Sequence, residues 1–143
     1  MRPRARAFYE RVLRMGALID EVMSADRVNR FLRLPTGART HITFMQGNHM
    51  FGKIALGEPL NYADACLDLL PRAHAPNVGY LAQAFELATP AAFDAAERAC
   101  REMDVEFVTE PETGGLPGLG RRRHAMVRNP GGGALQWLLG PPG

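Results

Sequence analysis

Residues 77–109, NVGYLAQAFELATPAAFDAAERACREMDVEFVT, decide the fold of this chain, because a helix stands between two strand-like runs. The apolar run 77–87 predicts a buried strand. Thr89 and Pro90 mark the start of a helix, since a threonine side chain caps free N–H groups and proline suits the first helical position. Residues 105–109 alternate as a second strand. The helix is predicted from apolar residues on one face, at Phe93, Ala96, Cys100 and Met103.

The chain after this stretch predicts two further strands. A loop rich in glycine and proline spans 111–120, and we expect it to cover the mouth of a cavity. Strands at 122–128 and 134–139 then flank a turn at 129–133. The second half therefore has the order βαβββ, and Trp137 is expected to point to the helix side of the sheet as a core residue.

The first half repeats most of this order. A strand at 17–23 follows the first helix, and a short inserted helix at 25–34 begins at the cap Ser24. Strands at 39–46 and 50–57 complete the half. The first helix has the apolar spacing of its counterpart, at Ala5, Phe8, Val12 and Met15. The inserted helix is expected to pack with Val28, Phe31 and Leu32.

The repeat predicts one domain over 1–143, with a first module at 1–58, a linker at 59–76 and a second module at 77–143. A short helix near 61–70 is expected in the linker, with Ala63, Cys66, Leu67 and Leu70 packed inward. The strand that opens the second module has no counterpart before the first helix. Its absence would leave backbone groups of a neighbouring strand unpaired, as an edge that another chain could fill.

Composition favours an ordinary globular protein of the cytoplasm. The 143 residues are 46% hydrophobic and 22% charged, which is typical of a folded domain. No apolar run is long enough to span a membrane, and the net charge of +2 is too small to predict a nucleic-acid partner. The basic clusters Arg2, Arg4, Arg6 and Arg121–Arg123 are interpreted as solvated surface. Cys66 and Cys100 match neither a disulfide framework nor a zinc pattern.

Two histidines support the duplication. His41 precedes Gly57 by sixteen residues, and His124 precedes Gly140 by sixteen. We therefore expect both histidines at equivalent places on matching strands, where they could face a cavity or make structural hydrogen bonds.

The paired modules resemble the vicinal oxygen chelate (VOC) superfamily, which includes glyoxalase I, bleomycin-resistance proteins and extradiol dioxygenases. The helix opening Phe8-Tyr9-Glu10-Arg11-Val12-Leu13-Arg14-Met15 is similar to the family's FY-E-x-V-L-x-M pattern. The stretch 129–137, NPGGGALQW, resembles its closing D-P-D-G-N-x-x-E-L signature, and 51–56, FGKIAL, resembles the strand that closes the first module. The resemblance implies an α+β fold of two βαβββ modules that form a half-open barrel, here with the opening strand of the first module absent.

The resemblance also implies a divalent metal, bound by His, Glu or Gln from the first and last strands of each module. The first position would lie on the absent strand. The second falls on Lys53 or Ala55, the third on Ala82 and the fourth on Gln136. Lysine and alanine are poor donors for a cation, and one neutral amide oxygen does not hold it against water. We therefore expect no metal cofactor, although a divalent metal stays possible if the donors lie elsewhere.

The expected ligand-binding residues are Lys53, Glu86, Gln136, His41 and His124. Glu86 beside Lys53 could act as an acid/base pair or form an ion pair on the sheet surface. Gln136 could donate a hydrogen bond to a ligand carbonyl. No catalytic residue is assigned.

Three functions stay open. The first is a binder of a small, largely apolar organic molecule in the cavity between the modules, without a metal. The second is a metal-dependent isomerase, lyase or dioxygenase of the glyoxalase or dioxygenase type. The third is an interaction module that pairs through its exposed sheet edge. A homodimer is the expected assembly, with neither nucleic acid nor membrane as a partner.

Overall fold

The computed structural model describes residues 2–50, 52–66, 82–131 and 133–140. The chain divides into two compact units, Met1–Asp68 and Leu69–Gly143. None of the described helices has the length and hydropathy needed to cross a membrane.

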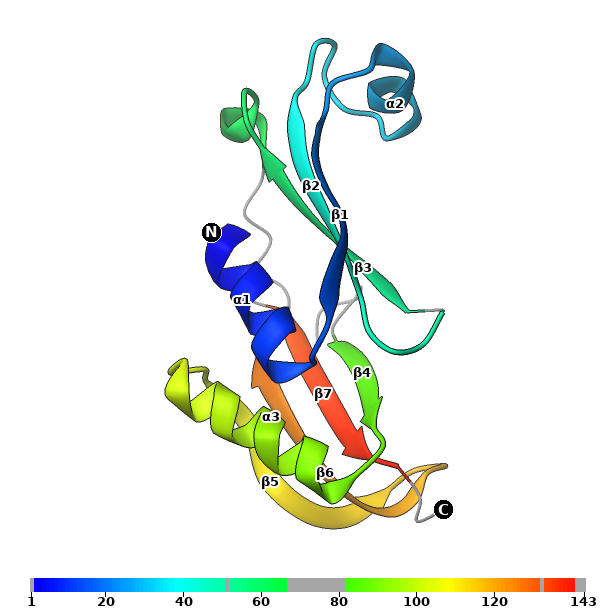
Figure 1. Ribbon diagram of the computed structural model, residues 1–143, viewed down its shortest axis with the longest axis vertical. Helices are drawn as coiled ribbons and strands as arrows, with labels where there is room; N and C mark the ends of the chain where they lie inside the picture. The colour runs from blue at the N-terminus through cyan, green and yellow to red at the C-terminus, as the bar shows by residue number, and fades with distance from the viewer. Residues whose placement is uncertain (1, 51, 67–81, 132, 141–143) are drawn as a thin grey trace. The chain divides into compact units, whose positions relative to one another are not determined.

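The second unit consists of a four-stranded sheet and one helix, α3 (Pro90–Glu102). The strands are β4 (Ala82–Leu87), β5 (Phe107–Leu116), β6 (Gly120–Arg128) and β7 (Ala134–Leu139), and they lie side by side in the order β4-β7-β6-β5. β4 runs parallel to β7, and the other neighbours are antiparallel. This order follows from the chain, because the helix carries it from β4 across the sheet while tight turns join β5, β6 and β7 (Figure 1).

The core of the second unit lies between α3 and the sheet. Trp137 is fully buried and meets Phe93 of α3 and Phe107 of β5 edge to face, with ring centroids 6.2 Å apart in both pairs. Thr89 accepts a hydrogen bond from the Ala92 N–H at 3.1 Å and caps the helix as predicted. Of the residues expected on the inner helix face, Phe93, Ala96 and Cys100 are buried, and Met103 is half-buried just beyond the helix.

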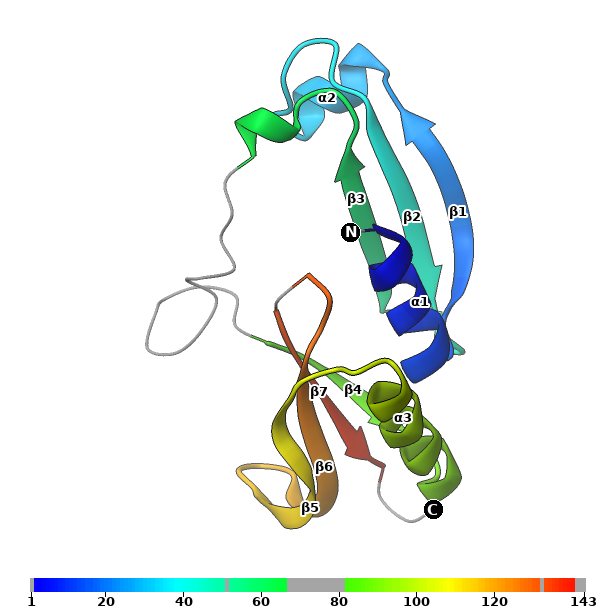
Figure 2. The ribbon, with the colours of Figure 1, turned by 90° about the vertical axis from the view of Figure 1, so that its left-hand side faces the viewer.

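The first unit has a three-stranded sheet in the order β1-β2-β3, formed by β1 (Gly16–Met23), β2 (Thr40–Gln46) and β3 (Lys53–Pro59). Helix α1 (Arg2–Val12) precedes the sheet and contacts β3 (Figure 2). Within residues 2–50 and 52–66 no strand pairs with the outer edge of β3, whereas β4 pairs with the matching strand β7 in the second unit. Among the described residues, the two sheets therefore differ by this one strand.

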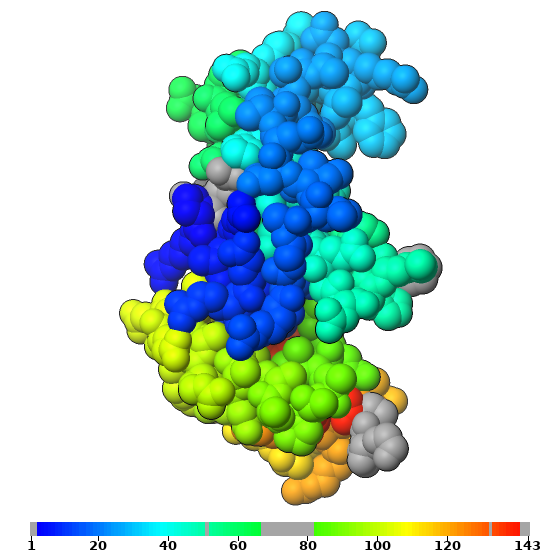
Figure 3. Space-filling model, in the orientation of Figure 1, coloured from blue at the N-terminus to red at the C-terminus, as the bar shows by residue number. Residues whose placement is uncertain are grey.

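The inserted helix differs from its prediction. α2 (Asp26–Phe31) begins after Ala25, without a side-chain cap from Ser24. Phe31 is 83% exposed and Leu32 is 45% exposed, so the expected apolar packing was wrong. The helix is attached instead through buried Asn29, whose side-chain amide donates to the Ala38 carbonyl at 2.9 Å. Figure 3 shows α2 projecting at the surface of the first unit.

The linker helix is also shorter than expected. Within the described part of the linker, only a 3₁₀ turn at Ala63–Ala65 is present. Ala63 and Cys66 are exposed rather than packed inward, because one turn buries little surface. The predicted contacts of Leu67 and Leu70 lie outside the described residues.

The segment 111–120 is mostly strand, not a loop over a cavity. β5 extends to Leu116 and pairs with β6. Proline and glycine are tolerated there because β5 is the edge strand of its sheet. Its register also shifts between Phe107 and Thr109 and again between Thr109 and Glu112, an interval that contains Pro111. A short turn follows, with Gly118 and Gly120 both at φ +74°.

Candidate functional site

One face of the second sheet points away from α3, and it carries most of the predicted site. Strand side chains alternate, and residues opposite one another on neighbouring strands share a face. Trp137 points toward α3, so its neighbour Gln136 points away from the helix. We call this surface the open face of the second sheet. Its members are Ala82, Ala84 and Glu86 of β4, His124 and Met126 of β6, and Gln136 and Leu138 of β7.

Gln136 lies at the middle of the open face. Its register partners are Ala84 on one side and Met126 on the other, so its amide stands between apolar neighbours. The side chain is half-buried, and its amide makes no hydrogen bond with any residue that the structure describes. A half-buried amide without a partner is a hydrogen-bonding group available to a ligand.

Glu86 lies at one end of the open face, beside an arginine that sequence reasoning missed. Its carboxylate is 3.4 Å from Nη1 of Arg122, and the two side chains are 59% and 19% exposed. An ion pair this long and this exposed contributes little to stability. Lys53, the partner expected from the sequence, donates instead to the Met50 carbonyl at 2.9 Å within the first unit.

His124 is a buried member of the open face. The residue is 7% exposed, and its Nε2 lies 3.6 Å from the Glu112 carboxylate, which is too far for a good hydrogen bond. Its Nδ1 is buried without a hydrogen-bond partner among the described residues. Such a nitrogen could accept from, or donate to, a small polar group that enters the face.

His41 lies on the helix-facing side of its sheet, unlike His124. It belongs to the side of the first sheet that faces α1, where its Nε2 is 2.8 Å from an oxygen of Asp20. The same carboxylate accepts from Thr43 at 2.9 Å and pairs with Arg6 of α1 at 2.6 Å. His41 thus helps to connect α1 to its sheet, and the expected equivalence of His41 and His124 was wrong.

The hairpin lengths explain this error. Six residues, 47–52, join β2 to β3, whereas five residues, 129–133, join β6 to β7. Counted back from the last paired residue of each strand, His41 matches Arg123, and both contact carboxylates on the helix side. A shift of one residue reverses the face of a strand side chain.

The same count settles which residue of β3 matches Gln136. Ala55 pairs with Phe44, two residues before the end of β2, and Gln136 pairs with Met126, two residues before the end of β6. The counterpart of Gln136 is therefore Ala55, as the family pattern indicated, and not Lys53. Lys53 is exposed and pairs with Gln46 at the very start of the hairpin.

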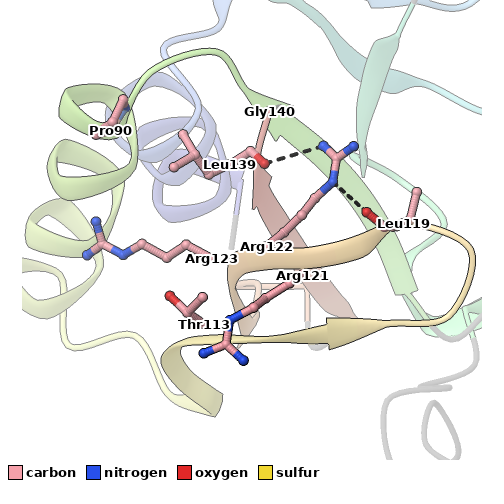
Figure 4. A pocket seen from close by; sticks show the side chains of 8 residues that line it. All are labelled: Pro90, Thr113, Leu119, Arg121, Arg122, Arg123, Leu139 and Gly140. Carbon is pink, nitrogen blue, oxygen red and sulfur yellow. Dashed lines mark hydrogen bonds between the residues drawn. The ribbon is translucent and has the colours of Figure 1, made fainter. Parts of the chain in front are cut away.

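A cavity of about 480 Å³ lies beside the second sheet, near the start of α3 (Figure 4). Sequence reasoning missed it, because it depends on β5 and β6 continuing as a hairpin through the segment interpreted as a loop. The lining residues are Pro90, Thr113, Leu119, Arg121, Arg122, Arg123, Leu139 and Gly140.

Comparison of the sequence with models of protein families and with curated proteins finds no match. Solved structures do resemble it. A glyoxalase family protein from Bacillus cereus superimposes with a TM-score of 0.77 over 96% of this chain and 85% of its own, at 17% identity. The fosfomycin resistance protein FosX from Mesorhizobium loti matches with a TM-score of 0.53 over 99% and 84%, at 13% identity. A glyoxylase/bleomycin resistance protein/dioxygenase domain from Frankia gives 0.53 over 99% and 84%, at 16% identity.

The chain therefore has the fold of the VOC superfamily. The predicted resemblance and the α+β class of two related modules are confirmed. The structural similarity to the Bacillus cereus protein covers nearly the whole of this chain. At these identities the likeness concerns the fold alone, and the chemistry must come from the residues in place.

The residues in place do not fit the divalent metal that the fold family implies. Two of the described positions expected to supply ligands hold Ala55 and Ala82, which have no donor atom, and a third holds the amide of Gln136. Among the residues that the structure describes, no three His, Cys, Asp or Glu side chains come together in a way that could hold an ion.

Proposed function

We propose that this VOC-fold protein binds a small, largely apolar organic molecule against the open face of the second sheet, without a metal. The amide of Gln136 carries the proposal. It stands half-buried between Ala84 and Met126, has no partner among the described residues, and occupies the position that the resemblance gives to a metal ligand. Here that position offers a hydrogen bond instead of a coordination bond.

The chemistry around Gln136 defines the ligand. Ala82 and Ala84 are exposed small apolar residues, so they leave room above β4 for an apolar body. Half-buried Met126 extends the apolar surface on β6, and Leu138 lies buried on β7. An apolar surface with a few well-placed polar groups is typical of small-molecule sites, where the polar groups fix orientation. A neutral aromatic or aliphatic compound with one hydroxyl or carbonyl oxygen suits this face.

Binding of 2-naphthol, a neutral aromatic alcohol, tests the proposal by NMR on the ¹⁵N-labelled protein. We expect chemical-shift changes at the Gln136 side-chain amide and at the backbone of Ala84 and Met126. The change Gln136→Met keeps the length of the side chain and removes the hydrogen bond, which lowers the affinity by about fivefold. Gln83→Met on the opposite face of β4 is the matched control and leaves the affinity unchanged.

Two outcomes would contradict this function. Equal loss of affinity in the Gln136 and Gln83 variants would show that the open face is not the site. Stoichiometric zinc, nickel, iron or manganese in the purified protein, with binding lost after chelation, would favour the metal-dependent isomerase, lyase or dioxygenase instead. We expect 2-naphthol to bind equally before and after treatment with EDTA.

We further propose that the protein acts in the cytoplasm as a homodimer. The outer edge of β3 has no strand beside it within the described part of the first unit, and unpaired strand edges favour association. Cys66 and Cys100 are both free thiols, which suits a reducing compartment. Light scattering after size-exclusion chromatography should give twice the mass of one chain at micromolar concentration. A monomer there would refute the dimer and the interaction-module function together.

A further inference from the structure

Most residues that line the cavity near the start of α3 lie on the opposite side of the sheet from Gln136. Thr113, Arg121, Arg123 and Leu139 belong to the face that also bears Trp137, because Thr113 pairs with Arg123 and Ala125 pairs with Trp137. Pro90 lines the cavity from the first turn of α3 (Figure 4). Arg122 lines the cavity from the other side of β6, where it contacts Glu86 of the open face. The cavity therefore adjoins one end of the open face, but Gln136, Ala84 and Met126 do not line it.

Three consecutive arginines line this cavity, and two of them already have partners. Arg123 contacts Asp94 at 2.6 Å and Glu97 at 3.2 Å, both on α3. Its guanidinium also lies 4.1 Å from the centre of the Phe93 ring. Two carboxylates balance one guanidinium, so Arg123 attaches α3 to the sheet and offers little positive charge to a ligand.

Arg122 also has partners, because its guanidinium donates hydrogen bonds to two backbone carbonyls. Its Nε donates to the Leu119 carbonyl at 2.9 Å, and its Nη1 donates to the Leu139 carbonyl at 3.4 Å (Figure 4). These two bonds connect the β5–β6 turn to the end of β7, and Glu86 lies against the same nitrogen. Arg122 therefore fixes one wall of the cavity.

Arg121 is different, because it forms no ion pair or hydrogen bond with any residue in the described parts of the chain. Gly115 lies opposite it on β5, and a Cβ there would meet no heavy atom within 4 Å, so open space adjoins the guanidinium stem. Thr113 contributes a hydroxyl from the same hairpin. An unpaired guanidinium with a hydroxyl nearby is suited to an anion with several oxygens, because arginine binds such groups with two parallel hydrogen bonds.

We propose that this cavity binds a small organic anion, with Arg121 pairing with its carboxylate or phosphate group. The apolar part of the anion would lie against Pro90, Leu119 and Leu139. The volume of about 480 Å³ is within the usual range of small-molecule sites. Because Gln136, Ala84 and Met126 do not line the cavity, this inference does not depend on the function proposed above.

Phenyl phosphate and benzoate are the probes, measured by calorimetry and by NMR of backbone and arginine Nε signals in the full chain. We expect at least one probe to bind and to shift Thr113, Leu139 and the Nε of Arg121. Arg121→Gln should weaken binding about tenfold, since a charge-assisted pair is lost. Thr113→Val, which keeps the shape and removes the hydroxyl, should weaken it several-fold. The matched control Arg98→Gln removes an equal charge from the exposed surface of α3 and should leave affinity unchanged.

The two probes identify the headgroup, since binding of phenyl phosphate alone would indicate a phosphate ester and binding of benzoate alone a carboxylate. Several results would overturn the proposal. These are no binding of either probe, equal weakening by Arg121→Gln and Arg98→Gln, or shifts at Gln136 and Ala84 in place of Thr113. If phenol bound with the same affinity as phenyl phosphate, a role for the charge would be excluded. If inorganic phosphate bound with the same affinity as phenyl phosphate, a role for the apolar contacts would be excluded.

Discussion

Replacing Phe93 with alanine should destabilise the second unit more than any change at its surface. The ring is fully buried, meets Trp137 edge to face at 6.2 Å, and lies under the Arg123 guanidinium at 4.1 Å. Truncation of a buried phenylalanine costs about 3–5 kcal/mol. The lost cation–π contact adds about 0.5–1 kcal/mol. We expect the free energy of unfolding to fall by about 3.5–6 kcal/mol, a large part of the 5–15 kcal/mol typical of a domain.

The assay uses the only tryptophan of the chain, Trp137, whose fluorescence reports unfolding of the second unit during titration with urea. Phe93→Leu keeps most of the volume and loses the ring contacts, so it should cost about 1–2 kcal/mol and remains measurable if the alanine variant fails to fold. Phe31→Ala is the control, because that side chain is 83% exposed, and it should change stability by less than about 0.5 kcal/mol. A loss below about 1.5 kcal/mol for Phe93→Ala would refute the packing of α3 described above.

Three further predictions concern capping, a thiol and an ion pair. Thr89→Ala should lower the free energy of unfolding by about 1 kcal/mol in the same urea titration, because the side-chain cap of α3 is lost. Thr89→Ser keeps the capping hydroxyl and should be nearly as stable as the original protein. Equal stability of the alanine and serine variants would contradict the cap. Burial raises the pKa of the Cys100 thiol from 9.0 to about 12. As the pH rises, the unfolded chain therefore loses this proton before the folded protein does, and the free energy of unfolding should decline above pH 9. In the native protein, exposed Cys66 should react with a thiol reagent at about pH 8 and buried Cys100 should not. Asp20→Asn removes the pair with Arg6 and should speed amide hydrogen exchange in α1 while leaving α3 unchanged.

The elements with local signals could be predicted from the sequence. Thr89 and Pro90 set the start of α3, and the apolar spacing set its inner face. β7 has the predicted limits, and β1, β2 and β6 differ by only one or two residues. These positions depend on caps, turns and periodicity, which act over a few residues.

The elements that depend on distant partners could not be predicted. Pro111 and the glycines around 114–120 favour a loop locally, but pairing with β6 at a sheet edge extends β5 through them. Phe31 and Leu32 have helical spacing without a surface to pack on, and buried Asn29 holds α2 instead. Propensity is a weak guide where tertiary contacts decide.

The candidate site was predicted in part. Gln136, Glu86 and His124 share one face, as strand alternation indicated. Arg122 was interpreted as solvated surface, but its side chain is only 19% exposed and holds two carbonyls and Glu86. No pattern in the sequence shows where a guanidinium finds carbonyl acceptors across a sheet. The ligand-binding roles of Lys53, Glu86, Gln136, His41 and His124 stay predictions.

The unequal hairpins have a consequence for anyone who redesigns this protein by copying one half onto the other. No single difference in residue number relates matching residues of the two halves. That difference is one larger between β2 and β6 than between β3 and β7, because the hairpin loops differ in length by one residue. A donor grafted to mirror Gln136 belongs at residue 55, and one grafted to mirror His124 belongs at residue 42. Transfer by the apparent offset of 83 would place His124 at residue 41, where its imidazole points to α1 instead of outward.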